Sequence, residues 1–335
     1  MGKRKPSGAV AGGLPAMPLE DWEPTKDTLH LWSQIVGKVQ LALTPRRNHW
    51  WNVTLQPTVR GLTTRRMAAG GESLELELDL VEHRLRALTP TCQTGFGLED
   101  GLSVADFHRR LDDVLDELGV AVTIRAEPFG VPMTTPFAED DEHASYDPAA
   151  ATRFLRVLQW SADGFEEFAG WYCGKTSPVQ LFWHSFDLAV SRFSGRRAPA
   201  IPGADPVTAE AYSHEVISFG FWAGDQRTPF PAYYSSTAPE PPGLRDRPLR
   251  PEAAGWVDQG SGSLALLRYD DVRSAGDPRA ALLDFLQSAF EAGASLAGWD
   301  LVGTATSWCP VPPERRSGPS PTAERPSDET VEPRS

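Results

Sequence analysis

The chain has 335 residues, with 32 Lys or Arg against 45 Asp or Glu, so its formal net charge at neutral pH is −13. Proteins that neutralise phosphates over a broad surface need an excess of basic residues, so this charge argues against nucleic acid as a partner. No apolar run approaches the roughly 20 residues that a membrane-spanning helix needs, which argues against an integral membrane protein. The 11 tryptophans are an unusually large number for this length.

The two ends of the chain differ from the middle. Residues 310–335 contain almost no large apolar side chain, so they cannot bury enough surface to offset their ordering entropy. Residues 1–17 hold three basic residues before an apolar stretch that is too weak for a secretory signal. We therefore predict a disordered leader over 1–17, a folded region over 18–301 and a disordered Pro-rich tail over 302–335.

The cysteines and the absence of standard motifs limit the biochemical class. Three widely spaced cysteines fit neither a disulfide framework nor a metal cluster, which favours a reducing compartment and predicts a cytoplasmic protein. They are Cys92, Cys173 and Cys309. The sequence lacks a Walker phosphate loop, a G-x-S-x-G elbow and an H-E-x-x-H zinc motif, so it indicates no particular cofactor or metal.

The first half of the folded region alternates between strand and helix patterns. The clearest strand has leucines at every second position from Leu74 to Leu80, alternating with Glu75, Glu77 and Asp79. Apolar residues at helical spacing predict a helix over 104–118, with Ser103 as its N-cap. Strands are predicted over 39–43, 49–60, 73–88 and 120–125.

The second half repeats this alternation. Asp147 and Pro148 are typical of a helix start and predict a helix over 146–172. Asp277 marks the start of a second helix, over 278–296. Strands are predicted over 179–193, 212–222 and 263–269. Strands interrupted by helices, with hairpin-like connections, indicate an α+β fold with a mainly antiparallel sheet and packed helices.

The two halves share a short spacing pattern. Each contains a Trp followed nine positions later by an Arg, in a segment read as a strand that precedes further strands and a helix. This pattern favours two similar halves that arose by duplication. The pairs are Trp51 with Arg60 and Trp183 with Arg192, and the halves would span 18–145 and 146–301.

Residues 174–196 form the densest mixture of polar and aromatic side chains. In a strand, Trp183 and Asp187 point to one face while Arg192 points to the other. A strand that lines a pocket has this character, because pockets are mainly apolar with a few converging polar groups. The alternative is a buried ion-pair network between Asp187 and the arginines. In the pocket interpretation, Arg192 and Arg196 bind an anion through bidentate contacts, with Lys175 as a further ligand-binding residue.

A second block, 212–216, holds Tyr212, His214 and Glu215. His214 and Glu215 are adjacent and face opposite ways in a strand, so each needs a partner from a neighbouring strand. A histidine near carboxylates can act as a general base, although a core histidine bonded to a backbone carbonyl fits the same pattern. We take His214, Asp187 and Glu215 as catalytic candidates, and Tyr212 as a ligand-binding candidate. A metal site that uses His184 lacks any spacing signature.

The third block, 48–52, has two consecutive tryptophans. On a strand, Trp50 and Trp51 lie on opposite faces, so one packs in the core while the other can line a groove. His49 at the strand entry is either a site residue or part of the turn. We count His49 and Trp50 among the ligand-binding candidates.

Seven blocks, in this order, resemble an uncharacterised bacterial family, the domain of unknown function 5996. The resemblance covers about 19–300 and implies no activity, cofactor or substrate. The family typically has Gly where this chain has His184, which makes His184 a poor candidate for an essential ligand. The blocks are LHLWSQIVGKVQLAL, NHWWNVTL, RGLTTR, VADFHRRLDDVL, GKTSPVQLFWHSFDLAVSRFSGRRAP, AYSHEVISFGFW and FLQSAFEAGASLAGWD.

These observations predict a soluble intracellular protein whose polar-aromatic pocket binds or transforms an anionic small molecule. The prediction requires Arg192, His214 and Asp187 to converge around one concavity, with Trp183 and Trp50 as apolar walls. The alternative is a non-catalytic scaffold or protein-interaction module in which the tryptophans are core or interface residues.

Overall fold

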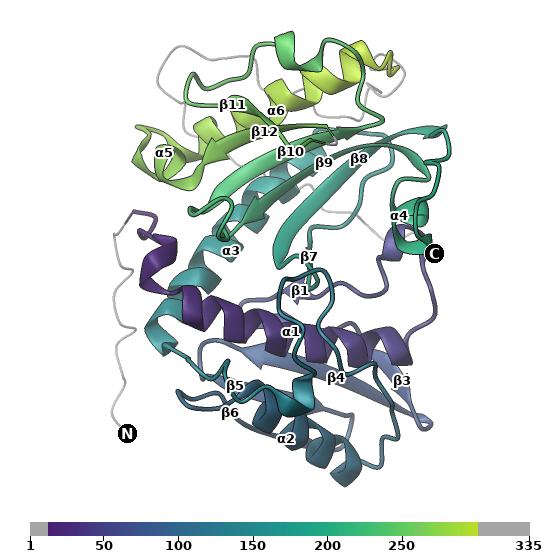
Figure 1. The fold of residues 1–335 in the computed structure, drawn as a ribbon, viewed down its shortest axis with the longest axis vertical. Helices are drawn as coiled ribbons and strands as arrows, with labels where there is room; N and C mark the ends of the chain where they lie inside the picture. Colours follow the sequence, from purple (N-terminus) through teal and green to yellow (C-terminus); the bar gives the residue numbers. More distant parts are fainter. Residues whose placement is uncertain (1–12, 261, 301–335) are drawn as a thin grey trace, which may run out of the picture.

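The fold is α+β, as predicted, and each half contains an antiparallel sheet (Figure 1). The computed structural model describes residues 13–260 and 262–300. None of the helices in these ranges has the length and apolarity needed to cross a membrane. Cys309 and the predicted tail lie outside the described residues. In the predicted leader, Met17 is buried and the Tyr269 hydroxyl donates to the Pro15 carbonyl, so packing begins before residue 18.

The first half consists of α1 (Glu23–Leu43), a sheet and α2 (Val104–Glu117). The strand order in the sheet is β1-β2-β4-β5-β6, and β3 pairs with β4. The strands are β1 (Gln56–Pro57), β2 (Gly61–Thr63), β3 (Met67–Ala69), β4 (Glu72–Asp79), β5 (Arg84–Leu88) and β6 (Gln93–Gly97). Short 3₁₀ turns are η1 (Leu19–Asp21), η2 (Asn48–Trp50) and η3 (Phe137–Glu139).

The second half begins with α3 (Pro148–Gly170) and ends with α6 (Pro278–Leu296). Its strands follow the order β11-β12-β10-β9-β8-β7. They are β7 (Gln180–Phe182), β8 (Asp187–Arg197), β9 (His214–Trp222), β10 (Ala232–Ala238), β11 (Gly255–Asp258) and β12 (Ser263–Arg268). The remaining helices are α4 (Pro206–Ala211), η4 (Leu244–Asp246) and α5 (Tyr269–Ser274).

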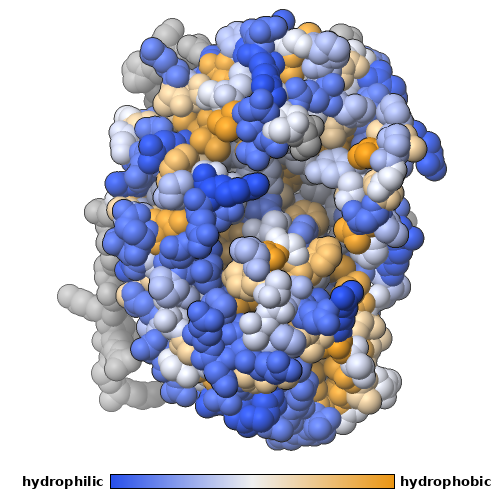
Figure 2. All heavy atoms as spheres, viewed as in Figure 1, coloured by the Kyte–Doolittle hydropathy of each residue, from blue (hydrophilic) through white to orange (hydrophobic). Residues whose placement is uncertain are grey.

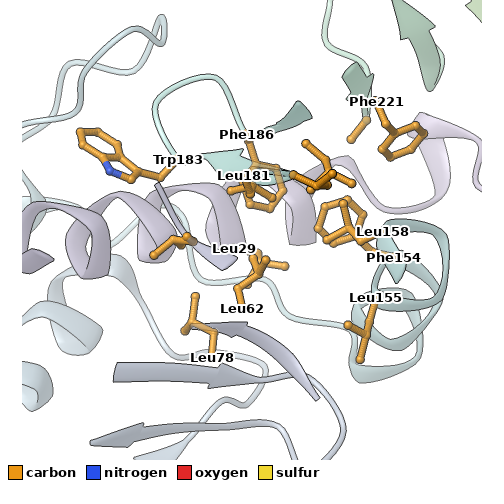
Figure 3. Packing of buried hydrophobic residues seen from close by; sticks show 14 of the residues in the cluster. Leu29, Leu62, Leu78, Phe154, Leu155, Leu158, Leu181, Trp183, Phe186 and Phe221 are labelled. Carbon is orange, nitrogen blue, oxygen red and sulfur yellow. The ribbon is translucent and has the colours of Figure 1, made fainter. Parts of the chain in front are cut away.

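The two halves share one hydrophobic core. In Figure 1, α1 lies between the two sheets. Figure 3 shows Leu29 of α1 near Leu62 and Leu78 of the first sheet, with Phe154 of α3 close to Phe186 of the second half. The backbones of Leu55 and Leu181 also exchange two hydrogen bonds across the halves, at 2.9 and 2.8 Å. This shared core holds α1 against the second half, next to the β7–β8 turn. The predicted duplication remains a prediction.

The predicted helix starts are confirmed. The Ser103 hydroxyl accepts the Asp106 N–H, and the carboxylates of Asp147 and Asp277 cap α3 and α6. The alternation in β4 is also confirmed, because its leucines are buried. Asp79 departs from the pattern: it is fully buried, where it accepts two backbone N–H groups and pairs with Arg60 at 2.7 Å.

Three strand predictions are wrong. Residues 39–43 are the end of α1. Just before them, Gly37 allows the Trp183 indole to lie against the helix. Residues 49–60 contain η2, a turn and only the two-residue β1. Residues 120–125 are not part of a strand. The predicted strand over 179–193 is two strands, β7 and β8, joined by a turn. In these segments, contacts with distant parts of the chain override local β-propensity.

Candidate functional site

A cavity of about 470 Å³ lies between the two halves. Its floor is one face of β8, β9 and β10, and its walls come from α1, residues 48–53, α4, residues 125–129 and the β7–β8 turn. Figure 2 shows the surface hollowed near the middle of the molecule. The cavity is within the size range of small-molecule sites and combines aromatic walls with a few polar groups.

The floor of the cavity follows from the strand register. Alternate residues of a strand point to the same face, so Ala189, Gly220 and Tyr234 form one row across β8, β9 and β10. Ser191, Ser218 and Ser236 form the next row, in which the Ser191 and Ser218 hydroxyls are 3.0 Å apart. These small side chains leave open space above the sheet and line it with hydroxyl groups.

Asp187 is the acidic group of the cavity. The residue is 7% exposed, and its carboxylate accepts hydrogen bonds from the Ser185 and Tyr234 hydroxyls. Burial, together with the neighbouring Asp187 charge, raises the pKa of Tyr234 well above its ordinary value, so its phenol stays protonated and donates. No Lys or Arg in the described ranges forms an ion pair with Asp187. Within the described ranges its hydrogen-bond donors are these two hydroxyls, and His184 is a neighbouring titratable group on which its charge acts.

Gly220 gives Tyr234 the room it needs to reach Asp187. A Cβ at Gly220 would lie 2.5 Å from the Tyr234 ring and hydroxyl. We therefore expect Gly220→Ala to displace Tyr234 and to lower the free energy of unfolding by about 1–3 kcal/mol, measured by urea denaturation. Gly97→Ala is the control, because Gly97 also lies in a strand and has open space at its Cβ position. Equal losses in both variants would contradict this account.

Lys38 is the buried basic group of the cavity. It lies on α1 with 7% exposure, and its Nζ is 5.6 Å from the Trp183 ring centroid and 5.9 Å from that of Phe137. Among the described residues, no carboxylate lies within ion-pair distance of this Nζ. Burial, and then the charge of Arg125, lowers the pKa of Lys38. Arg125 also lines the cavity, where it pairs with Glu127 at 2.7 Å.

His49 presents an unpartnered nitrogen. Its Nδ1–H donates to the Ala211 carbonyl at 3.2 Å, so Nε2 carries the lone pair, and this buried atom has no hydrogen-bond partner among the residues that the structure describes. The side chain is 5% exposed, and burial lowers its pKa, which keeps the ring neutral at pH 7. His49 and Trp50 both have left-handed backbones, with φ of 53° and 59°. Helix α4 holds this strained segment, since Glu210 accepts the His49 N–H and Val207 accepts the Trp50 indole N–H.

Five of the predicted site residues line this cavity, and five do not. Those that line it are His49, Trp50, Trp183, Asp187 and Tyr212. Tyr212 lies near Asp187, whose charge adds to burial in raising its pKa. The five outside the lining are Lys175, Arg192, Arg196, His214 and Glu215.

Arg192 points away from the cavity, into the core beneath α3 and α6. Its guanidinium lies 3.5 Å from the Phe168 ring centroid and 4.4 Å from that of Phe290, and it donates to the Phe168 carbonyl. Burial lowers its pKa to about 9, so it remains charged at pH 7. The predicted convergence of Arg192, His214 and Asp187 around one concavity is therefore absent, and we do not retain Arg192 as an anion ligand.

The remaining candidates also lie apart from Asp187. Arg196 pairs with Glu215 at 2.7 Å and donates to two carbonyls that follow α6. His214 bonds the Ser213 hydroxyl and packs near the His49 ring. Exposed Lys175 lies over the rings of Phe193 and Trp51, two residues that line the cavity. In the described ranges, no group of three His, Cys, Asp or Glu side chains is placed to hold a metal ion.

The model of the Family of unknown function (DUF5996) matches residues 14–305. The chain belongs to this family. The match confirms the resemblance seen in the seven sequence blocks and includes every residue that lines the cavity. No curated protein and no solved structure matches the chain.

Sequence reasoning missed three important residues of this DUF5996 cavity. Lys38 was overlooked because a strand was predicted directly after it, although a Lys between the apolar residues Val36 and Val39 is itself a signal. Tyr234 lies in β10, a strand that the patterns did not predict, and Ser185, the other hydroxyl donor to Asp187, lies in an unpredicted turn. No local signal reveals either of these hydroxyls as a partner of Asp187.

Proposed function

We propose that this protein binds a small molecule whose anionic group lies at Lys38 and whose apolar body lies between the aromatic walls of the cavity. The observation that carries this proposal is the buried Lys38 ammonium, which lines the cavity without a carboxylate partner in the described residues. An isolated buried charge is costly, and a bound anion would offset that cost. Arg125 lies at the same end of the cavity, but its charge is paired with Glu127, so Lys38 supplies the positive charge of this subsite.

The rest of the cavity supports the binding of an aromatic or apolar body. Trp50, Trp183 and Phe182 supply flat apolar walls, and the serine row supplies hydroxyls at the floor. His49 Nε2 can accept one hydrogen bond from the ligand, because the proton of this ring is on Nδ1. The proposal concerns binding and names no reaction.

Lys38→Met tests this proposal. Isothermal titration calorimetry would compare 4-methylbenzoate with its neutral analogue 4-methylbenzamide. We expect the wild type to bind the carboxylate more tightly, and Lys38→Met to weaken its binding about tenfold or more, because hydrogen bonds to charged groups are worth at least that much. Lys26→Met is the matched control, since Lys26 is equally buried on α1 but pairs with Asp27 and does not line the cavity.

Two results would overturn the proposal. One is equal affinity of the wild type for the two probes, and the other is the absence of binding by either probe at millimolar concentrations. The second result would favour the alternative of a non-catalytic scaffold, in which the buried tryptophans serve only the core.

A further inference from the structure

We propose that Asp187 is a second charged subsite of the cavity and that the ligand is a zwitterion, with a cationic amino group at Asp187 and an anionic group at Lys38. This inference rests on the proposed function and extends it to the class of ligand. It is motivated by two buried, opposite charges that line the same cavity without an ion pair between them.

The hydrogen bonds of Asp187 leave room for a ligand. A carboxylate has about four acceptor positions, and the Ser185 and Tyr234 hydroxyls occupy one on each oxygen. These hydroxyls keep the carboxylate in place but do not neutralise it. A primary ammonium group, which has three donors and a full positive charge, would supply the missing partner.

The surroundings of Asp187 also suit an organic cation. After burial, the Asp187 charge also raises the pKa of both Tyr234 and Tyr212, and Phe182 lines the adjacent wall. Aromatic rings attract cations through their negative faces, and this attraction grows where water is excluded. The raised pKa of Tyr234 keeps its phenol neutral, so it does not compete with Asp187 for the cation.

The separation of the two charges indicates a ligand with a spacer. Lys38 and Asp187 are not within the 4.0 Å of an ion pair, and the cavity wall between α1 and the β7–β8 turn includes Trp183. We therefore propose a ligand whose ammonium and carboxylate are separated by a flat apolar spacer such as an aromatic ring, which would contact the aromatic walls of the cavity.

Three probes of one shape test this inference. They are 4-(aminomethyl)benzoate, which has both charges, 4-methylbenzoate, which has only the anion, and 4-methylbenzylamine, which has only the cation. We expect the wild type to bind the zwitterion about tenfold more tightly than either single-charge probe, as measured by calorimetry. In Asp187→Asn the zwitterion should lose its advantage over 4-methylbenzoate.

Two further variants keep the test decisive. Asp163→Asn removes an exposed carboxylate from α3 and should keep the wild-type ratio of affinities. Tyr234→Phe removes a hydrogen bond but keeps the Asp187 charge, so it should also favour the zwitterion. If Asp187→Asn fails to fold, the test rests on the affinities of the wild type and of Tyr234→Phe for the zwitterion relative to the single-charge probes.

The inference is overturned if the wild type binds the zwitterion no more tightly than 4-methylbenzoate, or if the advantage persists in folded Asp187→Asn. This outcome differs from failure of the proposed function. If the proposed function failed, the wild type would bind 4-methylbenzoate no more tightly than 4-methylbenzamide.

Discussion

Arg192→Ala is expected to lower the free energy of unfolding by about 3–5 kcal/mol, because it empties a large buried site and removes a buried polar contact. Arg192 is 1% exposed, and its guanidinium fills the space between the rings of Phe168 and Phe290. Its loss leaves the Phe168 carbonyl at the end of α3 without this donor. Urea denaturation measures the effect.

Arg192→Met separates packing from charge. Methionine retains much of the apolar volume but cannot donate to Phe168, so we expect a smaller loss of about 1–3 kcal/mol. Ligand affinity, measured with 4-methylbenzoate, should stay unchanged in folded Arg192→Met because the side chain points away from the cavity. A stable Arg192→Ala that no longer binds the probe would restore the anion-ligand role and contradict this structural one.

Acidification is expected to destabilise the protein through His30. Burial is the main cause that lowers the pKa of His30 to about 3, and the charge of Lys26 adds to it. In the unfolded chain His30 binds a proton near pH 6.5, whereas in the folded chain it stays neutral until the pH approaches 3. The contribution of neutral His30 to the free energy of unfolding is therefore fully present above pH 6.5 and is lost as the pH falls toward 3. This difference amounts to about 4 kcal/mol at pH 3.5.

His30→Gln isolates this contribution. Gln does not titrate, and its amide can replace the donor to the Trp183 carbonyl, which lies 2.9 Å from His30 Nε2. Urea denaturation at pH 7 and pH 3.5 should show a smaller loss of stability for the variant than for the wild type. Equal losses would mean that other groups, such as His184 and the carboxylates, dominate the acid response.

The same histidine connects stability with the cavity. The His30 ring stacks on Phe186 at 4.9 Å, and Phe186 has a left-handed backbone with φ of 55°. Together with the bond to Trp183, this contact holds the turn that carries Trp183 and Asp187 into the cavity. Protonation of His30 should therefore loosen the candidate site before the rest of the fold.

Helix starts were predictable because their chemistry is local. A side chain at Ser103, Asp147 or Asp277 satisfies N–H groups two or three residues ahead, so the signal lies within one turn. The alternation in β4 was readable for the same reason, since the pleat alone sends successive side chains to opposite faces. Such patterns also indicated the α+β class.

Errors arose where a distant contact competes with local preference. Residues 39–43 have a β-rich pattern, but they belong to α1. The Trp183 indole of the second half packs against this helix at Gly37, which has no side chain in its way. The strand predicted over 179–193 breaks at a turn that His30 stabilises from α1. The residue pattern of one segment does not indicate which distant residues will contact it.

The candidate site shows the same division. Alternation along β8 places Asp187 and Arg192 on opposite faces, and this follows from the sequence pattern alone. Only the tertiary structure decides that α3 and α6 cover the Arg192 face while the Asp187 face borders a cavity. The physical reason is that the period of a strand is a property of its own backbone. The burial of each face depends on helices that are distant in the chain and pack there only when the whole core forms.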